Sequence, residues 1–165
     1  MSFNTNPQTA PAGKRGEDGI SFAIKCLRQG RSAQAFLILS EPGAEKAPEA
    51  RFALGLCHFL SGDVSAAISC FEQTLNLLKG RSAAKRNMNE SSETYIRLTE
   101  EQIKEKIYLT PMDADFFDHF PEAAEQAVLL ATIDAYLQKG MAEQAKRLSS
   151  GLIGPAFEEY KKKLQ

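Results

Sequence analysis

Residues 48–81 read PEARFALGLCHFLSGDVSAAISCFEQTLNLLKGR, and this stretch decides the fold. Pro48 starts a helix at a position where the N–H that proline lacks would have no helical partner. Gly62 supplies the left-handed residue that ends this helix, and Asp63 can cap the next one, which we expect from Val64 to Lys79. The stretch therefore predicts two helices that fold back on each other around a Gly-Asp turn.

A similar hairpin is expected earlier in the chain. Its first helix carries apolar residues at the i, i+4 and i+7 spacing of one helical face, namely Ile20, Ile24 and Leu27. Gly30 ends that helix, and a second apolar helix follows from Ala33 to Leu39, before Pro42 prevents its continuation. Gly30 and Gly62 lie 32 residues apart, so the two hairpins indicate a repeat.

The hairpin around Gly62 resembles the tetratricopeptide repeat (TPR), a helical hairpin with a period of about 34 residues. The matching residues are Leu54, Gly55, Gly62, Asp63, Ala67, Ile68, Phe71 and Leu75. Gly55 and Ala67 are small, which lets the two helices approach closely, and Phe71 fills space beside them. The pattern departs where the chain has Arg51, His58 and Thr74 in place of an aromatic residue, Tyr and Ala.

The outer parts of the chain keep less of this pattern. The first hairpin retains Ala23, Gly30 and Ala35, and residues 126–155 retain Tyr136, Gly140 and Ala145. The resemblance implies an all-α fold, a TPR-like α-α superhelix (solenoid) of about three helical hairpins. We expect these hairpins at about residues 17–41, 48–80 and 122–150.

Other segments do not follow the repeat. Residues 91–109 predict a helix whose apolar stripe is Ile96, Thr99, Ile103 and Ile107, and we interpret it as an inserted helix or a degenerate repeat. Residues 155–164 predict a C-terminal capping helix that closes the stack. Residues 1–16 offer little that can pack and are expected to form a flexible tail, which leaves residues 17–165 as a single helical domain.

Composition limits the class of protein. The chain has 165 residues, 43% of them hydrophobic and 25% charged, with a formal net charge of −1, so neither nucleic acid nor an acidic membrane is expected as a partner. The basic stretch 79–86 contains no aromatic residue for base stacking and is interpreted as a solvated loop. No window reaches the ~18 apolar residues of a membrane helix. Three cysteines without metal-ligand spacing suit a reducing compartment, and we expect a cytoplasmic protein.

Groups for catalysis are few. Cys57 and His58 are neighbours, but adjacent residues on a helix point about 100° apart, so they form no dyad. The two glycine-rich nucleotide-binding motifs, GxxxxGK(S/T) and GxGxxG, are both missing from the sequence, and no cofactor is expected. The densest group of metal-ligand types is Asp113, Asp115, Asp118 and His119. Acidic residues are also favoured at the N-terminus of a helix, which is the alternative interpretation of this group. A metal-dependent activity at 113–119 is therefore the weaker hypothesis, and we predict that the protein is not an enzyme.

The helix from Pro48 to Ser61 is apolar on nearly every face, which is typical of a helix buried on all sides. One face packs on its own hairpin partner. In the TPR family the first helices line a concave surface, and the resemblance implies that the second face belongs to such a groove. The expected partner-binding residues are Ile20, Ile24, Leu27, Phe52, Leu56, Phe59, Leu60, Leu130 and Leu137.

Three occupants of this groove are open. The chain itself can fill it with residues 91–108 or 116–120, a peptide or helix of another protein can bind there, or the chain can self-associate into a homo-oligomer. We expect a non-enzymatic protein-protein interaction scaffold, an adaptor or chaperone that binds an apolar or amphipathic segment. The alternative is a structural subunit that uses the apolar face for permanent assembly.

Overall fold

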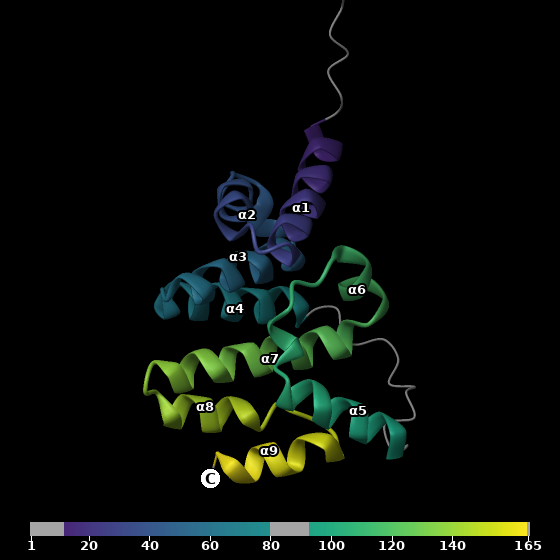
Figure 1. Ribbon diagram of the computed structural model, residues 1–165, viewed down its shortest axis with the longest axis vertical. Coiled ribbons are helices and arrows are strands. Elements are labelled where there is room, and N and C mark those ends of the chain that lie inside the picture. The colour runs from purple at the N-terminus through teal and green to yellow at the C-terminus, as the bar shows by residue number, and fades with distance from the viewer. Residues whose placement is uncertain (1–11, 80–92, 165) are drawn as a thin grey trace, which may run out of the picture.

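The computed structural model describes residues 12–79 and 93–164. All regular structure in these two ranges is helical, which confirms the predicted all-α class there (Figure 1). The α-helices are α1 Ala12–Arg28, α2 Ser32–Leu39, α3 Pro48–Ser61, α4 Val64–Leu78, α5 Glu93–Lys104, α6 Ala114–His119, α7 Pro121–Gln138, α8 Ala142–Ser149 and α9 Glu158–Lys163. The 3-10 helices are η1 Ala44–Lys46, η2 Ile107–Leu109 and η3 Pro155–Phe157.

The three expected hairpins are α1 with α2, α3 with α4, and α7 with α8. Each turns at a glycine with a left-handed backbone, Gly30, Gly62 or Gly140. The first helix begins at Ala12, so residues 12–16 of the expected tail are helical, although two of these five residues are glycine. Residues 1–11 of that tail and residues 80–86 of the basic stretch lie outside the described ranges.

The α3/α4 hairpin has the close helix contact that its sequence predicts. A Cβ atom placed on Gly55 would lie 2.6 Å from Cε1 of Phe71, closer than real Cβ contacts come. Ala67, Phe71 and Leu75 are all buried beside this contact. The side chain of Asp63 accepts a hydrogen bond from the backbone N–H of Ala66 at 3.1 Å, which caps α4 as expected.

Neighbouring hairpins pack against each other in chain order. α2 contacts α3, and α4 lies along α7, although residues 80–120 separate α4 from α7 in the sequence. In Figure 1, α5 and α6 lie to one side of this row of hairpins, on the right of the view. The segment that does not match the repeat is therefore placed outside the helix pairs.

The predicted helix 91–109 is shorter than expected. α5 ends at Lys104, and Lys106 adopts a left-handed backbone before the separate 3-10 helix η2. The cause is tertiary: Lys106 Nζ and Tyr108 Oη both bond to Oδ2 of Asp134 on α7, at 2.8 and 2.7 Å. These contacts outweigh local helix propensity. Residues 91 and 92 lie outside the described part of the chain.

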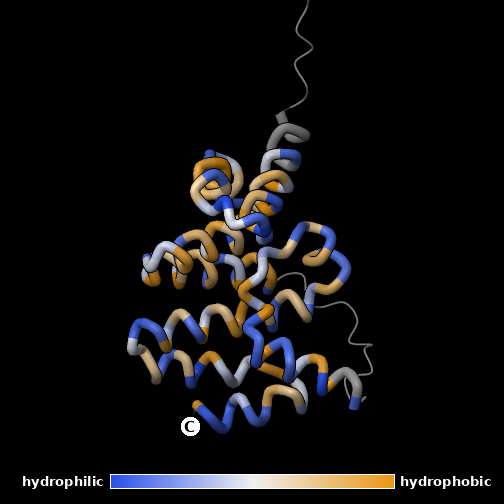
Figure 2. The backbone as a smooth tube through the Cα atoms, viewed as in Figure 1, coloured by the Kyte–Doolittle hydropathy of each residue, from blue (hydrophilic) through white to orange (hydrophobic). Residues whose placement is uncertain are grey.

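The C-terminal segment also differs in detail from the expected cap 155–164. It divides into η3 and α9, and Phe157 of η3 is buried in the main core. α9 carries Lys161, Lys162 and Lys163 in its last turn, where positive charge suits the helix dipole. Figure 2 shows the contrast, with hydrophobic residues frequent along α3 and α4 and hydrophilic ones along α9.

Candidate functional site

Most of the residues expected to line a partner groove lie inside the protein. Ile24, Leu27, Phe52, Leu56 and Leu130 are buried in the core, and Ile20 and Phe59 are partly buried against it. Leu60 and Leu137 keep 67% and 39% of their surface exposed. The expected groove is therefore closed along most of its length.

Phe52 shows what closes it. Its ring lies 5.6 Å from the ring of Phe71 and 6.3 Å from the ring of Phe117, measured between centroids. Phe117 belongs to α6 and is itself fully buried. Of the occupants that the sequence left open, the chain's own segment 116–120 is the one in contact with Phe52, through Phe117. The assignment of Phe52 and Leu56 to an open partner surface is corrected accordingly.

A different groove lies between the inserted segment and α7. It has a volume of about 720 Å³ and is bordered by α5, η2, α6, the N-terminal half of α7 and η3. Four large apolar side chains in its lining are half exposed: Leu98 at 55%, Ile107 at 49%, Phe120 at 50% and Ile153 at 54%. Leu130 is the one expected partner-binding residue that reaches this groove. We call it the α5–α7 groove.

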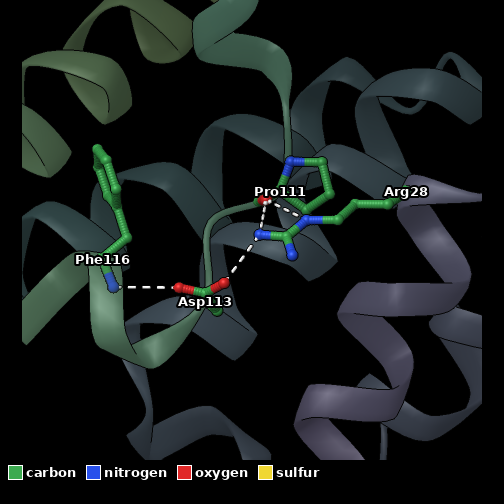
Figure 3. A network of polar contacts seen from close by, with 4 residues as sticks. All are labelled: Arg28, Pro111, Asp113 and Phe116. Atoms are coloured by element: carbon green, nitrogen blue, oxygen red, sulfur yellow. Dashed lines mark hydrogen bonds and ion pairs between the residues drawn. The ribbon is translucent and has the colours of Figure 1, made fainter.

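Arg28 of α1 holds the loop between η2 and α6, which lines part of the α5–α7 groove (Figure 3). Its Nε and Nη2 donate to the carbonyl oxygen of Pro111 at 3.2 and 3.1 Å, and Nη2 also bonds to Oδ2 of Asp113 at 3.0 Å. The other carboxylate oxygen of Asp113 accepts from the backbone N–H of Phe116 at 3.1 Å and caps α6. Both hydrogen bonds, the one from Arg28 first, hold the pKa of Asp113 below its ordinary value.

Asp134 of α7 holds the residues just before this loop. This carboxylate is 10% exposed and binds Lys106 and Tyr108, the residues that lead into and form η2. Burial, together with the hydrogen bond to Asp134, raises the pKa of Tyr108 above its ordinary value, so the phenol stays protonated and donates. Burial, together with the nearby charge of Asp134, also raises the pKa of Tyr160 on α9. Asp134 thus positions η2, which contributes Ile107 and Tyr108 to the lining of the groove.

The acidic stretch 113–119 is used within the fold. Asp113 caps α6 and pairs with Arg28, and His119 Nδ1 lies 2.8 Å from the backbone oxygen of Asp115. Within residues 12–79 and 93–164, no group of three or more His, Cys, Asp or Glu side chains is placed to hold a metal ion. The lining of the α5–α7 groove combines apolar side chains with a few charged ones.

Comparison of the chain with protein-family models, with curated proteins and with solved structures finds no match. In the described ranges, none of the helices combines the length and the apolar character needed to cross a membrane.

Sequence reasoning placed Ile107 on an apolar stripe but did not assign Leu98, Phe120 or Ile153 to a site. Leu98 lies off that stripe, so the helix carries apolar residues on more than one face. This second apolar face is the feature of the sequence that could have indicated the groove. No sequence feature indicates Ile153, because this residue follows α8 in the chain and reaches the groove only in the folded protein.

Proposed function

We propose that this protein is a non-enzymatic interaction scaffold, of adaptor or chaperone type, that binds an apolar or amphipathic segment of a partner protein in the α5–α7 groove. One observation carries the proposal: Leu98, Ile107, Phe120 and Ile153 surround a single cavity and all are half exposed. Clusters of this kind on a protein surface mark sites of protein or ligand contact. A cavity of this size also exceeds what one or two side chains can occupy.

The proposed architecture is a TPR-like superhelix with an insertion. Packing of α2 on α3 and of α4 on α7 supports a continuous row of hairpins, and the insertion enters between the second and third hairpin. α9 and η3 would cap the C-terminal end. In this arrangement the groove is built by the insertion and not by the concave face of the repeats.

We place the protein in the cytoplasm. Cys26, Cys57 and Cys70 are buried free thiols, and burial raises the pKa of Cys57 to about 11. Protonated, buried thiols of this kind are inert and are compatible with a reducing compartment.

A second candidate function is permanent assembly through a different face. Phe22, Phe36, Leu37 and Leu60 are exposed on the first two hairpins, with Leu37 70% exposed. A structural subunit that assembles with itself or with another chain would cover them. Light scattering after size exclusion tests this candidate, and a monomer at all concentrations measured would contradict self-assembly.

Matched surface variants test the groove. Leu98→Glu places a charge in the groove, and Leu60→Glu places the same charge on an equally exposed leucine outside it. Partners are captured from a lysate of the source cells on each immobilised protein and identified by mass spectrometry. We expect Leu98→Glu to lose the partner at least about tenfold and Leu60→Glu to keep it, because a charge buried at an interface costs more than 1.4 kcal/mol.

Both substitutions are at exposed sites, so the helical circular dichroism signal should be unchanged in each. If Leu98→Glu captures the same proteins as the wild type, the groove is not the binding site. If Leu60→Glu alone loses them, the exposed face of the first two hairpins is the functional surface.

A further inference from the structure

The charge of the chain is unevenly distributed. Residues 93–126 contain nine acidic and three basic residues, a formal net charge of −6, whereas the whole chain carries −1. The remaining residues therefore carry +5. Of the 21 residues that line the α5–α7 groove, 16 come from this acidic segment.

The lining itself has the same sign. Among the described residues that border the groove, the carboxylates are Asp113, Glu122 and Glu125 and the cation is Arg28. Arg28 already bonds to Asp113 at 3.0 Å and to the carbonyl oxygen of Pro111. Nearby, Lys106 is bound to Asp134 at 2.8 Å. The field that a partner meets at the mouth of this groove is therefore negative.

The walls also restrict the backbone of a partner. The structure contains helices and no strand in residues 12–79 and 93–164, so those residues offer no sheet edge to which an extended peptide could add. A helix satisfies its own backbone hydrogen bonds and can present one apolar face to the groove. Helix-in-groove binding is thus a recognition mode that suits these walls.

We propose that the occupant of the α5–α7 groove is a basic amphipathic helix of another protein. Its apolar face contacts Leu98, Ile107, Phe120 and Ile153, and its lysines and arginines flank that face and lie near Glu122 and Glu125 of the groove lining. This inference rests on the proposed function and specifies the charge and conformation of the partner segment. Complementary charge sets the orientation of the helix and raises the rate of association, while the apolar face supplies most of the affinity.

The test is a selection with a display library of random peptides of about 16 residues, the length of about four helical turns. The full chain is the target, and the variant Leu98→Gln is the counter-target, since it removes apolar surface without adding charge. We expect the enriched peptides to carry a net charge of about +2 or more, with apolar residues at i, i+3, i+4 and i+7.

One enriched peptide is then measured by fluorescence anisotropy against two charge variants. Glu122→Gln removes a carboxylate in the first turn of α7 at the groove, and Glu143→Gln removes one in the first turn of α8, outside the groove. We expect Kd to rise about threefold to tenfold in the first variant and less than about twofold in the second, and the difference to shrink as salt is added.

The outcomes separate this inference from the proposed function. The enriched peptides can turn out neutral or acidic, or lack helical periodicity, while the Leu98→Gln variant still fails to bind them. This result would overturn the basic helix and leave the proposed function of the groove intact. Enrichment that is the same on Leu98→Gln would overturn both. Sedimentation equilibrium that detects a dimer, which Leu98→Gln dissociates, would assign the groove to a second copy of the chain and also overturn the inference.

Discussion

The α3/α4 hairpin and the inserted segment 93–120 reach their structures by different means. The hairpin is closed by neighbours in sequence: Gly55 allows Phe71 to pack against the backbone of α3, and no space remains between the helices. The insertion is held by distant residues at its middle, since Arg28 binds Pro111 and Asp113, and Asp134 binds Lys106 and Tyr108. Local packing buries most apolar residues of the hairpin, although Leu60 and Leu77 stay exposed, whereas attachment through its middle leaves Leu98 and Phe120 of the insertion exposed.

The largest expected effect on stability concerns the contact between the α3/α4 hairpin and the inserted segment. Phe52 of α3 is fully buried between Phe71 of its own hairpin and Phe117 of the insertion. We expect Phe52→Ala to lower the free energy of unfolding by about 3–5 kcal/mol, because the substitution removes buried apolar surface and leaves a cavity. Urea denaturation followed by circular dichroism measures this loss.

The variant Phe117→Ala, alone and combined with Phe52→Ala, measures how much of this loss of stability comes from the contact between the two regions. Because Phe52 and Phe117 are in contact, the double variant should lose less stability than the two single variants added together, by about 0.5–3 kcal/mol. Strictly additive losses would contradict the covering of α3 by α6. The expected groove of the repeat would then be open at Phe52.

Gly55→Ala tests the hairpin alone. The new Cβ would lie 2.6 and 2.7 Å from two ring carbons of Phe71 and 3.1 Å from Cβ of Cys70, so the ring must move from a fully buried position. We expect a loss of about 1–3 kcal/mol, despite the better helix propensity of alanine. Gly19→Ala is the control, since its Cβ would meet a side-chain carbon of Ile38 at an ordinary 3.8 Å. Equal effects of the two variants in thermal unfolding would refute the close contact.

The same difference explains what could be predicted from the sequence. The helix ends of the α3/α4 hairpin follow from local signals such as Pro48, Gly62 and the cap Asp63, and the structure has them within about one residue of the prediction. The early end of α5 depends on Asp134, which lies 26 residues beyond Tyr108. No local pattern reports such a contact. For the same reason the apolar residues of α3 were assigned to an open surface, because their cover, Phe117, comes from another element.

The smallest expected effect concerns the attachment of the insertion to α1. The pKa of Asp113 is lowered in the folded state by the hydrogen bonds from Arg28 and Phe116, so this group stabilises the fold above the ordinary pKa of about 4 and the contribution disappears as pH falls through the lowered value. Asp113→Asn keeps a side chain that can cap α6 but removes the charge.

We expect Asp113→Asn to cost less than about 1 kcal/mol at pH 7, since the pair with Arg28 is half exposed and screened by solvent. The difference from the wild type should vanish near pH 2, when urea denaturation is repeated at several pH values. Arg28→Gln removes the same charge pair from the other side, so combining it with Asp113→Asn should add little to the pH-dependent part of the loss. A pH-independent difference would mean that Asp113 holds the insertion through its cap alone, and that the contact between α1 and the insertion is not electrostatic.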